Sequence, residues 1–193
     1  MVRVSFESME SALEERLGEE GFAHCQAVAE TAALLASVYG VDAELARAAG
    51  LLHDWDRDVD AESLVRLAIE AGLEVTSVDR VVPYLLHART GAADVRSAFP
   101  DIDEEVIRAI ERHTVGHPEM SDLDKVVYIA DMIAPGRHYP GVEDLRACAG
   151  SVSLGDLFGL CYQQSVGHLV KERKRLHPMT VEVWNALVAR EQR

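Results

Sequence analysis

The stretch Ala48–Asp58 reads AAGLLHDWDRD and raises the main structural question of this sequence. Its first half has the alanine, glycine and leucine residues of a buried helix face. The face then ends in His53 and Asp54, which stand side by side where apolar residues would continue. An imidazole and a carboxylate at the edge of a core need a partner, because burying an unpaired charged group is costly. The stretch therefore predicts a helix with a polar site at its end.

Length and composition predict one globular domain. The chain has 193 residues, of which 48% are hydrophobic, enough for a single core of good size. We therefore expect one domain over residues 1–193. No apolar run approaches the roughly 18 residues of a membrane span, and the first residues, MVRVSFESMESALEERL, lack the basic end and apolar stretch of a signal peptide. We expect a cytoplasmic protein without a membrane partner.

Charge and cysteine usage exclude other classes of protein. The net charge of −14 argues against a nucleic-acid-binding surface, because such a surface would repel the phosphate backbone. A small anionic substrate is compatible with this charge if basic groups gather around its site. The cysteines (Cys25, Cys148 and Cys161) are far apart and form no CxxC pair. This pattern indicates reduced thiols in the cytoplasm and neither a disulfide framework nor a zinc–thiolate site.

Helical periodicity dominates the whole chain, and no stretch alternates as a strand would. We expect helices over residues 22–39, 42–54, 60–72, about 78–87, 103–113, 121–134, about 154–176 and 177–190. Gly40 ends the first helix, Asp42 is a suitable N-cap for the second, and Pro135 stops the helix that precedes it. The predicted fold class is all-α, a compact single-domain helical bundle.

Further polar groups lie at the edges of apolar stretches. The short connection at Gly40 favours an antiparallel helix pair, in which His24 and the His53–Asp54 pair lie at comparable heights. Asp131 stands in VVYIADMIA (126–134), a helix that is apolar nearly all round, so its carboxylate needs a cation or strong donors. Two more histidines, in PYLLHAR (83–89) and IERHT (110–114), have comparable settings.

These groups together favour a metal centre. A single histidine near an apolar face is more often a core or capping residue. Six such groups on five segments change that balance: His24, His53, Asp54, His87, His113 and Asp131. Imidazole and carboxylate ligands without thiolate suit iron, manganese or zinc in a catalytic role. Six ligands are too many for one ion that also holds water, so they favour two ions bridged by a carboxylate, an arrangement suited to phosphoryl chemistry.

The remaining histidines have simpler explanations. His117 and His138 fall in expected loops, and we keep them only as substrate contacts. His168 lies on a long amphipathic helix, and His177 precedes a proline at a helix boundary. None of these four is expected in the metal shell.

The order His, His-Asp, Asp is the signature of the HD-domain phosphohydrolase superfamily. Longer stretches carry a more specific resemblance: HCQAVAETAALLA (24–36), AAGLLHD (48–54), LLHARTGA (85–92), AIERHTVGHPEMSDLDKVVYIADMIAPGRHYPGVEDLR (109–146) and HPMTVEVWNAL (177–187). Through them the chain resembles the YqeK family, the HD-superfamily bis(5'-nucleosyl)-tetraphosphatases that cleave symmetrically. The resemblance covers nearly the whole chain.

This resemblance implies a helical HD fold, with the metal-site core over residues of about 20–146 and C-terminal helices of about 152–190 packed on it. It implies two metal ions, in the first place iron, with manganese or zinc as alternatives. The enzyme would split diadenosine tetraphosphate into two ADP by attack of a metal-bound hydroxide. By position, one metal would be held by His24, His53, Asp54 and Asp131, and the other by His87 and His113. Asp54 would be the bridging, catalytic carboxylate.

The same resemblance suggests phosphate-contacting residues. The matching positions are Thr114, Gly116, Lys125, Arg137 and Arg146. We predict Lys125 and Arg137 as the main catalytic cations, because Lys125 precedes Asp131 on one helix and Arg137 follows that helix directly. Relatives usually have a lysine shortly after the His-Asp pair, and here Arg57 is expected to replace it as a substrate contact.

Several alternatives stay open from the sequence. Lys125 could instead pair with Asp122 or Asp124 as a solvated lysine, and Arg146 could pair with its acidic neighbours. The basic cluster KERKR (171–175) is interpreted as a solvated helix face. The function could be that of another HD phosphohydrolase, such as a nucleotidase or a guanosine-tetraphosphate hydrolase, or of a non-catalytic nucleotide-binding module. A complete ligand set favours an enzyme acting on a small nucleotide, either as a monomer or as a homodimer.

Overall fold

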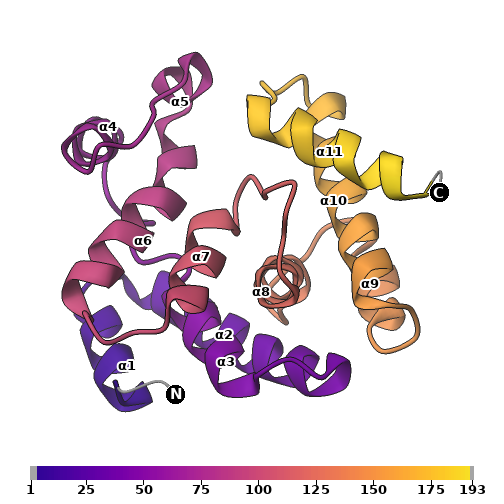
Figure 1. Cartoon of the computed structure of the whole chain (residues 1–193), viewed down its shortest axis with the longest axis horizontal. Helices are drawn as coiled ribbons and strands as arrows, with labels where there is room; N and C mark the ends of the chain where they lie inside the picture. Colours follow the sequence, from indigo (N-terminus) through magenta and orange to yellow (C-terminus); the bar gives the residue numbers. More distant parts are fainter. Residues whose placement is uncertain (1–3, 192–193) are drawn as a thin grey trace.

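The computed structural model describes residues 4–191, and in that part of the chain all regular structure is helical. The elements are α1 (Phe6–Glu14), α2 (Glu19–Tyr39), α3 (Ala43–Leu52), α4 (Ala61–Glu70), α5 (Ser77–Val81), the 3₁₀ turn η1 (Pro83–Leu86), α6 (His87–Ala98), α7 (Glu104–Arg112), α8 (Asp122–Ile133), α9 (Val142–Cys148), α10 (Leu154–Lys171) and α11 (Pro178–Glu191). Helix α8 lies in the middle, between the α2–α3 pair with α7 on one side and α9–α10 on the other (Figure 1). The prediction of an all-α bundle is confirmed.

Several helix boundaries follow the predicted capping signals. The Asp42 side chain accepts hydrogen bonds from the backbone N–H groups of residues 44 and 45 and so begins α3. Gly40 ends α2 in the left-handed region, with φ of 72°, which a glycine adopts without strain. Ser121 and Asp124 form a reciprocal capping box at the start of α8. One buried apolar cluster continues from Met9 in α1 to Val183 in α11. Such continuity is what a single domain requires, although the domain boundaries themselves stay a prediction.

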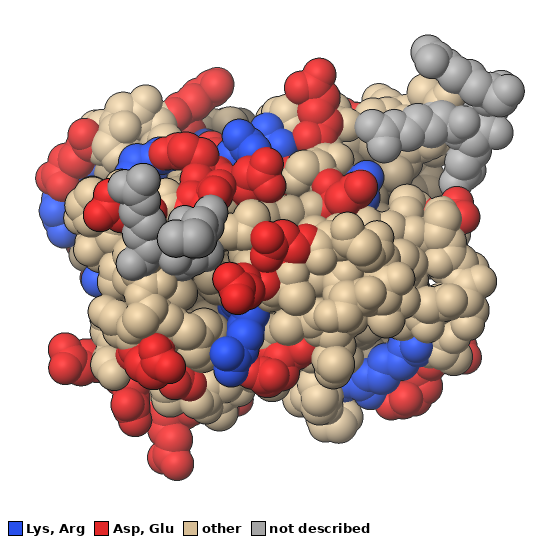
Figure 2. Space-filling model, turned by 60° about the horizontal axis from the view of Figure 1, so that its bottom comes forward, with Lys and Arg blue, Asp and Glu red and all other residues tan. Residues whose placement is uncertain are grey.

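The surface is predominantly acidic, in line with the net charge of −14. Acidic side chains are spread over much of the face shown in Figure 2, with basic side chains lying among them. Within residues 4–191, no helix is long and apolar enough to cross a membrane. A basic group that has no acidic partner is therefore notable wherever it occurs on this molecule.

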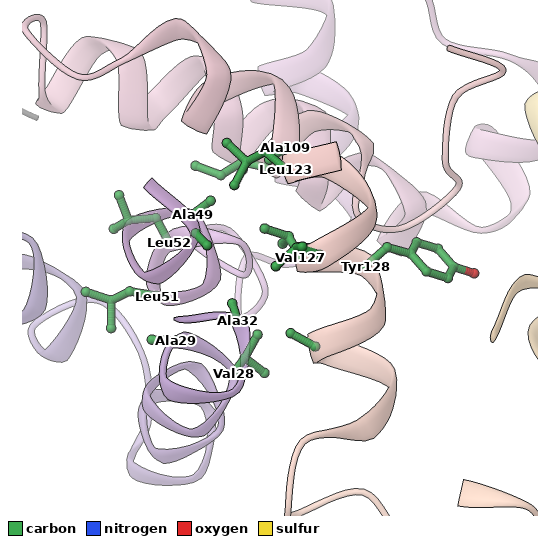
Figure 3. Packing of buried hydrophobic residues seen from close by; sticks show 14 of the residues in the cluster. Val28, Ala29, Ala32, Ala49, Leu51, Leu52, Ala109, Leu123, Val127 and Tyr128 are labelled. Carbon is green, nitrogen blue, oxygen red and sulfur yellow. The ribbon is translucent and has the colours of Figure 1, made fainter. Parts of the chain in front are cut away.

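The packing between α2 and α3 determines where the polar end of α3 lies. Figure 3 shows Ala29 and Ala32 of α2 facing the α3 helix, with Val127 of α8 closing the same core. A Cβ atom added at Gly50 would come within 3.0 Å of the Ala29 Cα atom and of a backbone oxygen of α2. The two helices therefore cross at a distance that only glycine allows, and His53, three residues further on, lies close to α2.

Two predicted helix boundaries are wrong. The helix expected over residues 78–87 is interrupted at Val82, because the ring of Pro83 disfavours a helical conformation in the residue before it. The chain continues as the 3₁₀ turn η1. The long helix expected to reach residue 176 ends at Lys171, and Arg173 then takes a left-handed conformation with φ of 53°. A non-glycine residue in this region gives no sequence signal, so the early end was not foreseen.

Helices α1, α6 and α9 were not predicted. Two of them are short, and α6 carries polar and small residues over much of its length. Helix α6 nevertheless has a buried face. A Cβ atom added at its Gly91 would lie 3.4 Å from the backbone nitrogen of Asp56, so α6 packs directly on the turn that follows His53 and Asp54. Helix α6 is thus one of the walls of the site described next.

Candidate metal centre

Three helical segments end at one point, and each has a histidine as its C-cap. His53 follows α3, His87 follows η1, and His113 follows α7. All three side chains are buried, with exposures of 0%, 2% and 4%. A helix C-terminus carries partial negative charge and therefore favours a cation nearby, as at the ends of α3 and α7. His87 is also the first residue of α6, so η1 contributes its histidine without a free helix C-terminus.

The three rings are oriented in the same way. Each Nδ1–H donates a hydrogen bond to the carbonyl oxygen three residues earlier: His53 to Gly50 at 2.8 Å, His87 to Tyr84 at 2.5 Å, and His113 to Ile110 at 2.8 Å. A carbonyl can only accept, so the proton of each neutral ring is on Nδ1. The Nε2 atoms are left as bare acceptors pointing inward. Fixing the tautomer in this way is typical of metal-ligating histidines.

The other two predicted ligands arrive from longer helices. His24 lies within α2, and its Nε2 atom is 3.0 Å from an oxygen of Asp131 in α8. The Nε2 atom of His53 is 3.7 Å from the same oxygen. The structure therefore brings Asp131 to both histidines, as predicted from the apolar surroundings of this acid in the sequence. The His24 and His53 rings meet edge to face, with their centroids 5.3 Å apart.

Asp54 lies between two groups of histidines and turns one oxygen toward each. Its Oδ2 atom is 3.3 Å from Nε2 of His53 and 3.7 Å from that of His24. Its Oδ1 atom is 3.1 Å from Nε2 of His87 and 3.6 Å from that of His113. Asp54 therefore contacts four of the predicted histidine ligands at once.

The donor set fits a bound metal. The Nε2 atom of His53 is buried and has no hydrogen-bond donor, and such an orphaned atom is costly unless something else satisfies it. Ligand atoms of His24, His53 and Asp131 lie close enough to one another to share an ion, as do those of His53, Asp54 and His113. Nitrogen and oxygen donors without sulfur suit iron, manganese or zinc.

The carboxylates and His113 favour ligation, whereas His53 opposes it: burial lowers the pKa of His53, but the Asp54 carboxylate raises it overall, so a metal ion would displace a proton there. Burial opposes ionisation of Asp54, but the neighbouring histidines, with His53 first among them, hold the pKa of this carboxyl well below its usual range. Burial likewise opposes ionisation of Asp131, and the hydrogen bond from His24 helps to keep the pKa of that carboxyl low. Burial lowers the pKa of His113. Anionic carboxylates and a neutral imidazole are the forms that bind metal ions.

A cavity of about 440 Å³ opens onto the centre. Its floor is formed by Asp54, His87, His113 and Asp131, and its walls by Tyr84, Thr114, Tyr128, Met132, Arg137, Ser165 and His168. A volume of this size falls within the range of small-molecule sites. Thr114 contacts two of the histidines, with its Oγ1 atom 3.0 Å from Nε2 of His113 and 3.4 Å from Nε2 of His87.

Two of the predicted cations reach this centre. Arg137 pairs with the Asp131 carboxylate, and its Nε–H donates to the Asp131 carbonyl oxygen at 2.8 Å. Arg57 donates to the Oδ2 atom of Asp54 at 2.7 Å and therefore occupies the place predicted for the missing lysine. Both guanidinium groups are partly exposed, at 35% and 29% of the side chain, so each can face both a ligand carboxylate and an incoming anion.

Lys125 is not at this centre, which corrects its predicted role. Its Nζ donates to Asp122 at 2.7 Å, and the side chain lines a different cavity, between α8 and α10. The reason is helical phase. Lys125 and Asp131 are six residues apart on α8, and at 3.6 residues per turn they point about 120° away from each other.

Arg146 and Gly116 also have structural roles in place of the predicted contacts. The Arg146 guanidinium donates to three carbonyl oxygens after α8, those of Ile133 at 2.9 Å, Ala134 at 2.7 Å and Arg137 at 3.0 Å. It therefore fixes the loop that carries Arg137. Gly116 has φ of 78°, and a Cβ atom there would lie 3.1 Å from the ring of Tyr162, so this glycine is needed for packing.

The acid that follows the His-Asp pair is neutralised from elsewhere in the fold. Asp56 is fully buried and pairs with Arg16, in the segment between α1 and α2. The same guanidinium donates to the Trp55 carbonyl oxygen at 2.8 Å and to Asp94 at 2.8 Å. Arg16 therefore stabilises the turn that carries Asp54 through its contacts with Trp55 and Asp56. Because Asp56 is paired, it adds no free negative charge to the cavity.

Sequence reasoning missed the residues that complete the cavity from α10. Ser165 and His168 line it, although His168 was interpreted as an ordinary helix residue. Their spacing of three places them on one helix face, but the sequence does not say which face meets the metal centre. Two aromatic residues, Tyr84 and Tyr128, also line the cavity. Trp55 packs on Phe99, and the Tyr139 hydroxyl donates to the Met132 carbonyl oxygen.

Comparison with known proteins places this geometry in a family. The model of the HD domain family matches residues 21–136, which contain all six predicted metal ligands. A symmetrical bis(5'-nucleosyl)-tetraphosphatase of Halalkalibacterium halodurans is 34% identical over 172 residues, covering 89% of this chain and 91% of that protein. The enzyme of the same name from Bacillus subtilis is 30% identical over 179 residues, covering 93% and 95%.

A solved structure agrees with the sequence comparisons. A Clostridium acetobutylicum protein, described as a predicted HD superfamily hydrolase involved in NAD metabolism, superimposes with a TM-score of 0.90 and 35% sequence identity. The match covers 97% of this chain and 98% of that one. The similarity therefore includes the C-terminal helices as well as the segment matched by the family model.

Proposed function

Because the chain belongs to the HD-domain family and, within it, to the YqeK family of symmetrical bis(5'-nucleosyl)-tetraphosphatases, we propose that it is a metal-dependent hydrolase that splits diadenosine tetraphosphate into two ADP. The observation that carries the proposal is the position of Asp54, whose two oxygens face two separate groups of imidazole nitrogens. A carboxylate so placed is suited to a pair of ions acting on one phosphate.

We propose that the centre holds two metal ions, iron in the first place. His24, His53, Asp54 and Asp131 would hold one, and His87 and His113, with the second oxygen of Asp54, the other. When bound, such ions polarise a phosphoryl oxygen and lower the pKa of a bound water molecule, so that a nucleophile is available near neutral pH. The remaining chemistry depends on residues of the chain itself.

Arg137 and Arg57 would bind and orient the polyphosphate. Each guanidinium contacts a ligand carboxylate and is partly exposed. Arg137 lines the cavity, so its N–H donors would meet an entering phosphate oxygen, whereas Arg57 would act from beside Asp54. The Thr114 hydroxyl lies between His87 and His113 and can donate to an oxygen at the reacting phosphorus. These donors would stabilise the charge that develops as the leaving ADP departs.

Product analysis tests this function. Purified protein loaded with Fe²⁺ or Mn²⁺ is incubated with diadenosine tetraphosphate in ¹⁸O-labelled water. The nucleotides are then separated, and their masses are determined by mass spectrometry. We expect ADP as the only product, with the label in one of the two ADP molecules formed from each substrate. Formation of AMP and ATP would contradict symmetric cleavage.

Other substrates distinguish the remaining candidates. The same preparation is offered a nucleoside monophosphate, guanosine tetraphosphate and NAD, the last because of the description of the Clostridium acetobutylicum protein. Release of phosphate, release of pyrophosphate, or cleavage of NAD into AMP and nicotinamide mononucleotide would each indicate a different phosphohydrolase. We expect all three rates to be much lower than the rate with diadenosine tetraphosphate.

Metal analysis tests the ligand set independently of turnover. We expect about two metal ions per chain after reconstitution, and fewer in His87→Ala and His113→Ala, because the second ion loses a nitrogen ligand. Wild-type metal content in both variants would contradict the assignment. We further propose that the enzyme acts on free nucleotide in the cytoplasm, a setting supported by the free cysteines, two of which are buried.

A further inference from the structure

A second cavity, of about 400 Å³, adjoins the cavity over the metal centre. The two share four lining residues: Thr114, Tyr128, Ser165 and His168. Away from the metal centre, the second cavity has an apolar wall made of Val82, Leu85, Val166 and Leu169. It ends at two basic residues, Lys174 and Arg175. A ligand that fills the first cavity can therefore continue into the second without leaving the protein surface.

The backbone after α10 is shaped so that these two basic residues turn back toward the cavity. Arg173 is in the left-handed region, and the N–H of Lys174 donates to the Leu169 carbonyl oxygen at 2.8 Å. This bond closes a helix-ending turn of the kind that usually has glycine at the left-handed position. An arginine in this region is strained, and strain of this kind is concentrated at functional sites.

Lys174 and Arg175 differ from the other cations near the site. Arg57 and Arg137 each have a carboxylate partner. Among the described side chains, those of residues 4–189, none forms an ion pair or a hydrogen bond with the side chain of Lys174 or Arg175. On a protein with a net charge of −14, two unpaired cations at the mouth of a cavity produce a local attraction for anions.

We propose that this second cavity binds the second nucleoside diphosphate half of the substrate. The inference rests on the proposed function and specifies how it would select two-headed nucleotides. The phosphates of the second half pass Thr114 and His168 and are held by Lys174 and Arg175, and the nucleoside packs against the apolar wall. Cleavage in the middle of the polyphosphate follows because each half has its own cavity, one on either side of the shared residues.

The test is the number of ADP molecules that bind to the Mn²⁺-loaded protein, measured by titration calorimetry. We expect two per chain for the wild type and one for the variant Lys174→Ala/Arg175→Ala. The matched control is Lys171→Ala/Arg173→Gly, which removes the same charge from residues outside both cavities and suits the left-handed backbone at residue 173. The control should bind two ADP. The inference is overturned if the wild type binds one ADP, if the cavity variant still binds two, or if the control also loses one.

Kinetics separate this inference from the proposed function. With diadenosine tetraphosphate, the cavity variant should show a KM raised roughly tenfold or more, as expected for lost charge-assisted hydrogen bonds, with kcat changed much less. With adenosine 5'-tetraphosphate, which keeps all four phosphates and lacks only the second nucleoside, the penalty should be similar, because the lost cations are proposed to hold phosphates. If the KM for adenosine 5'-tetraphosphate does not change in the cavity variant, Lys174 and Arg175 do not hold the phosphates of the second half. If diadenosine tetraphosphate is not cleaved at all, the proposed function fails, but the count of bound ADP still decides whether the second cavity binds a nucleotide.

Discussion

The two acids on either side of Trp55 have opposite surroundings. Asp56 is fully buried and faces Arg16, a permanent cation supplied by another part of the chain. Asp54 is nearly as buried, but its Oδ1 atom faces only the Nε2 atoms of His87 and His113. Asp79 and Asp124 resemble Asp56, because each is buried and paired with an arginine, Arg89 or Arg112. An acid that stabilises the fold thus has an arginine as its main partner. Asp54 also contacts Arg57, but its two oxygens are shared with the Nε2 atoms of four histidines, and a metal ion would suit this set of nitrogen ligands.

The largest effect should come from Asp54→Asn. We expect kcat/KM for diadenosine tetraphosphate to fall by at least about 10³-fold, because a shared ligand of both metal ions contributes several kcal/mol to the transition state. The measurement is steady-state kinetics with equal total metal. The control is Asp101→Asn, an exposed acid in the turn before α7, which should keep activity. Retention of more than a tenth of the activity in Asp54→Asn would remove the distinction between Asp54 and the arginine-paired acids.

Metal removal should produce the next largest effect. At a concentration a hundred times Kd, Mn²⁺ should raise the Tm of metal-stripped protein by roughly 5–10 °C, because binding to the folded state alone adds about 2.7 kcal/mol. The measurement is differential scanning calorimetry of the wild type, Asp56→Asn and Asp54→Asn, each with and without Mn²⁺. The shift should persist in Asp56→Asn and become much smaller in Asp54→Asn. Equal shifts in the two variants would show that the bound ion does not depend on Asp54.

Asp56→Asn should reduce stability more than catalysis. We expect a loss of about 1–3 kcal/mol in the free energy of unfolding, because the buried hydrogen bonds of Arg16 lose their charged acceptor. Urea unfolding of Asp56→Asn, Arg16→Ala and the double variant measures the coupling between the two residues, which should be favourable. The kcat/KM per folded molecule should stay within about tenfold of wild type. Loss of activity at unchanged stability would instead make Asp56 part of the reaction.

The smallest effect concerns pH and Asp79. Burial opposes ionisation of this acid, but hydrogen bonds from Thr76 and the charge of Arg89 lower its pKa overall. Because the pKa is lower in the folded state, the unfolded chain binds more protons between the two values. The stability from Asp79 is therefore complete above its unfolded pKa of about 4 and is lost as the pH falls through the folded value. In urea unfolding, the difference between wild type and Asp79→Asn should shrink on acidification, whereas a constant difference would contradict this pairing.

Ligands and cations differed in how well they could be predicted from the sequence. His53, Asp54 and Asp131 interrupt apolar helix faces, and a buried polar group without a local partner points to a partner elsewhere. Lys125 does not interrupt an apolar helix face, so it gives no comparable signal. Whether its side chain reaches the centre depends on helical phase and on the nearby Asp122. The fold class was predictable because helical periodicity can be recognised from neighbouring residues alone. This periodicity is pronounced in α2 and α8.

The rest depended on contacts that a sequence does not record. The end of α10 was missed because Arg173 adopts a conformation that usually indicates glycine. Lys174 and Arg175 were therefore assigned to a solvated helix face, although the structure places them at the second cavity. Arg16 was not singled out, because its partner Asp56 lies forty residues further along the chain.

The hydrogen bonds from the histidine rings to the carbonyl groups three residues earlier have a consequence for assembly. Each bond joins two groups that are three residues apart in the chain. The orientation of each ring is therefore fixed by local contacts and does not depend on distant parts of the chain. Docking these three segments then brings three oriented histidines and Asp54 together, while α2 and α8 supply His24 and Asp131. An arriving ion would meet histidines that need little rearrangement.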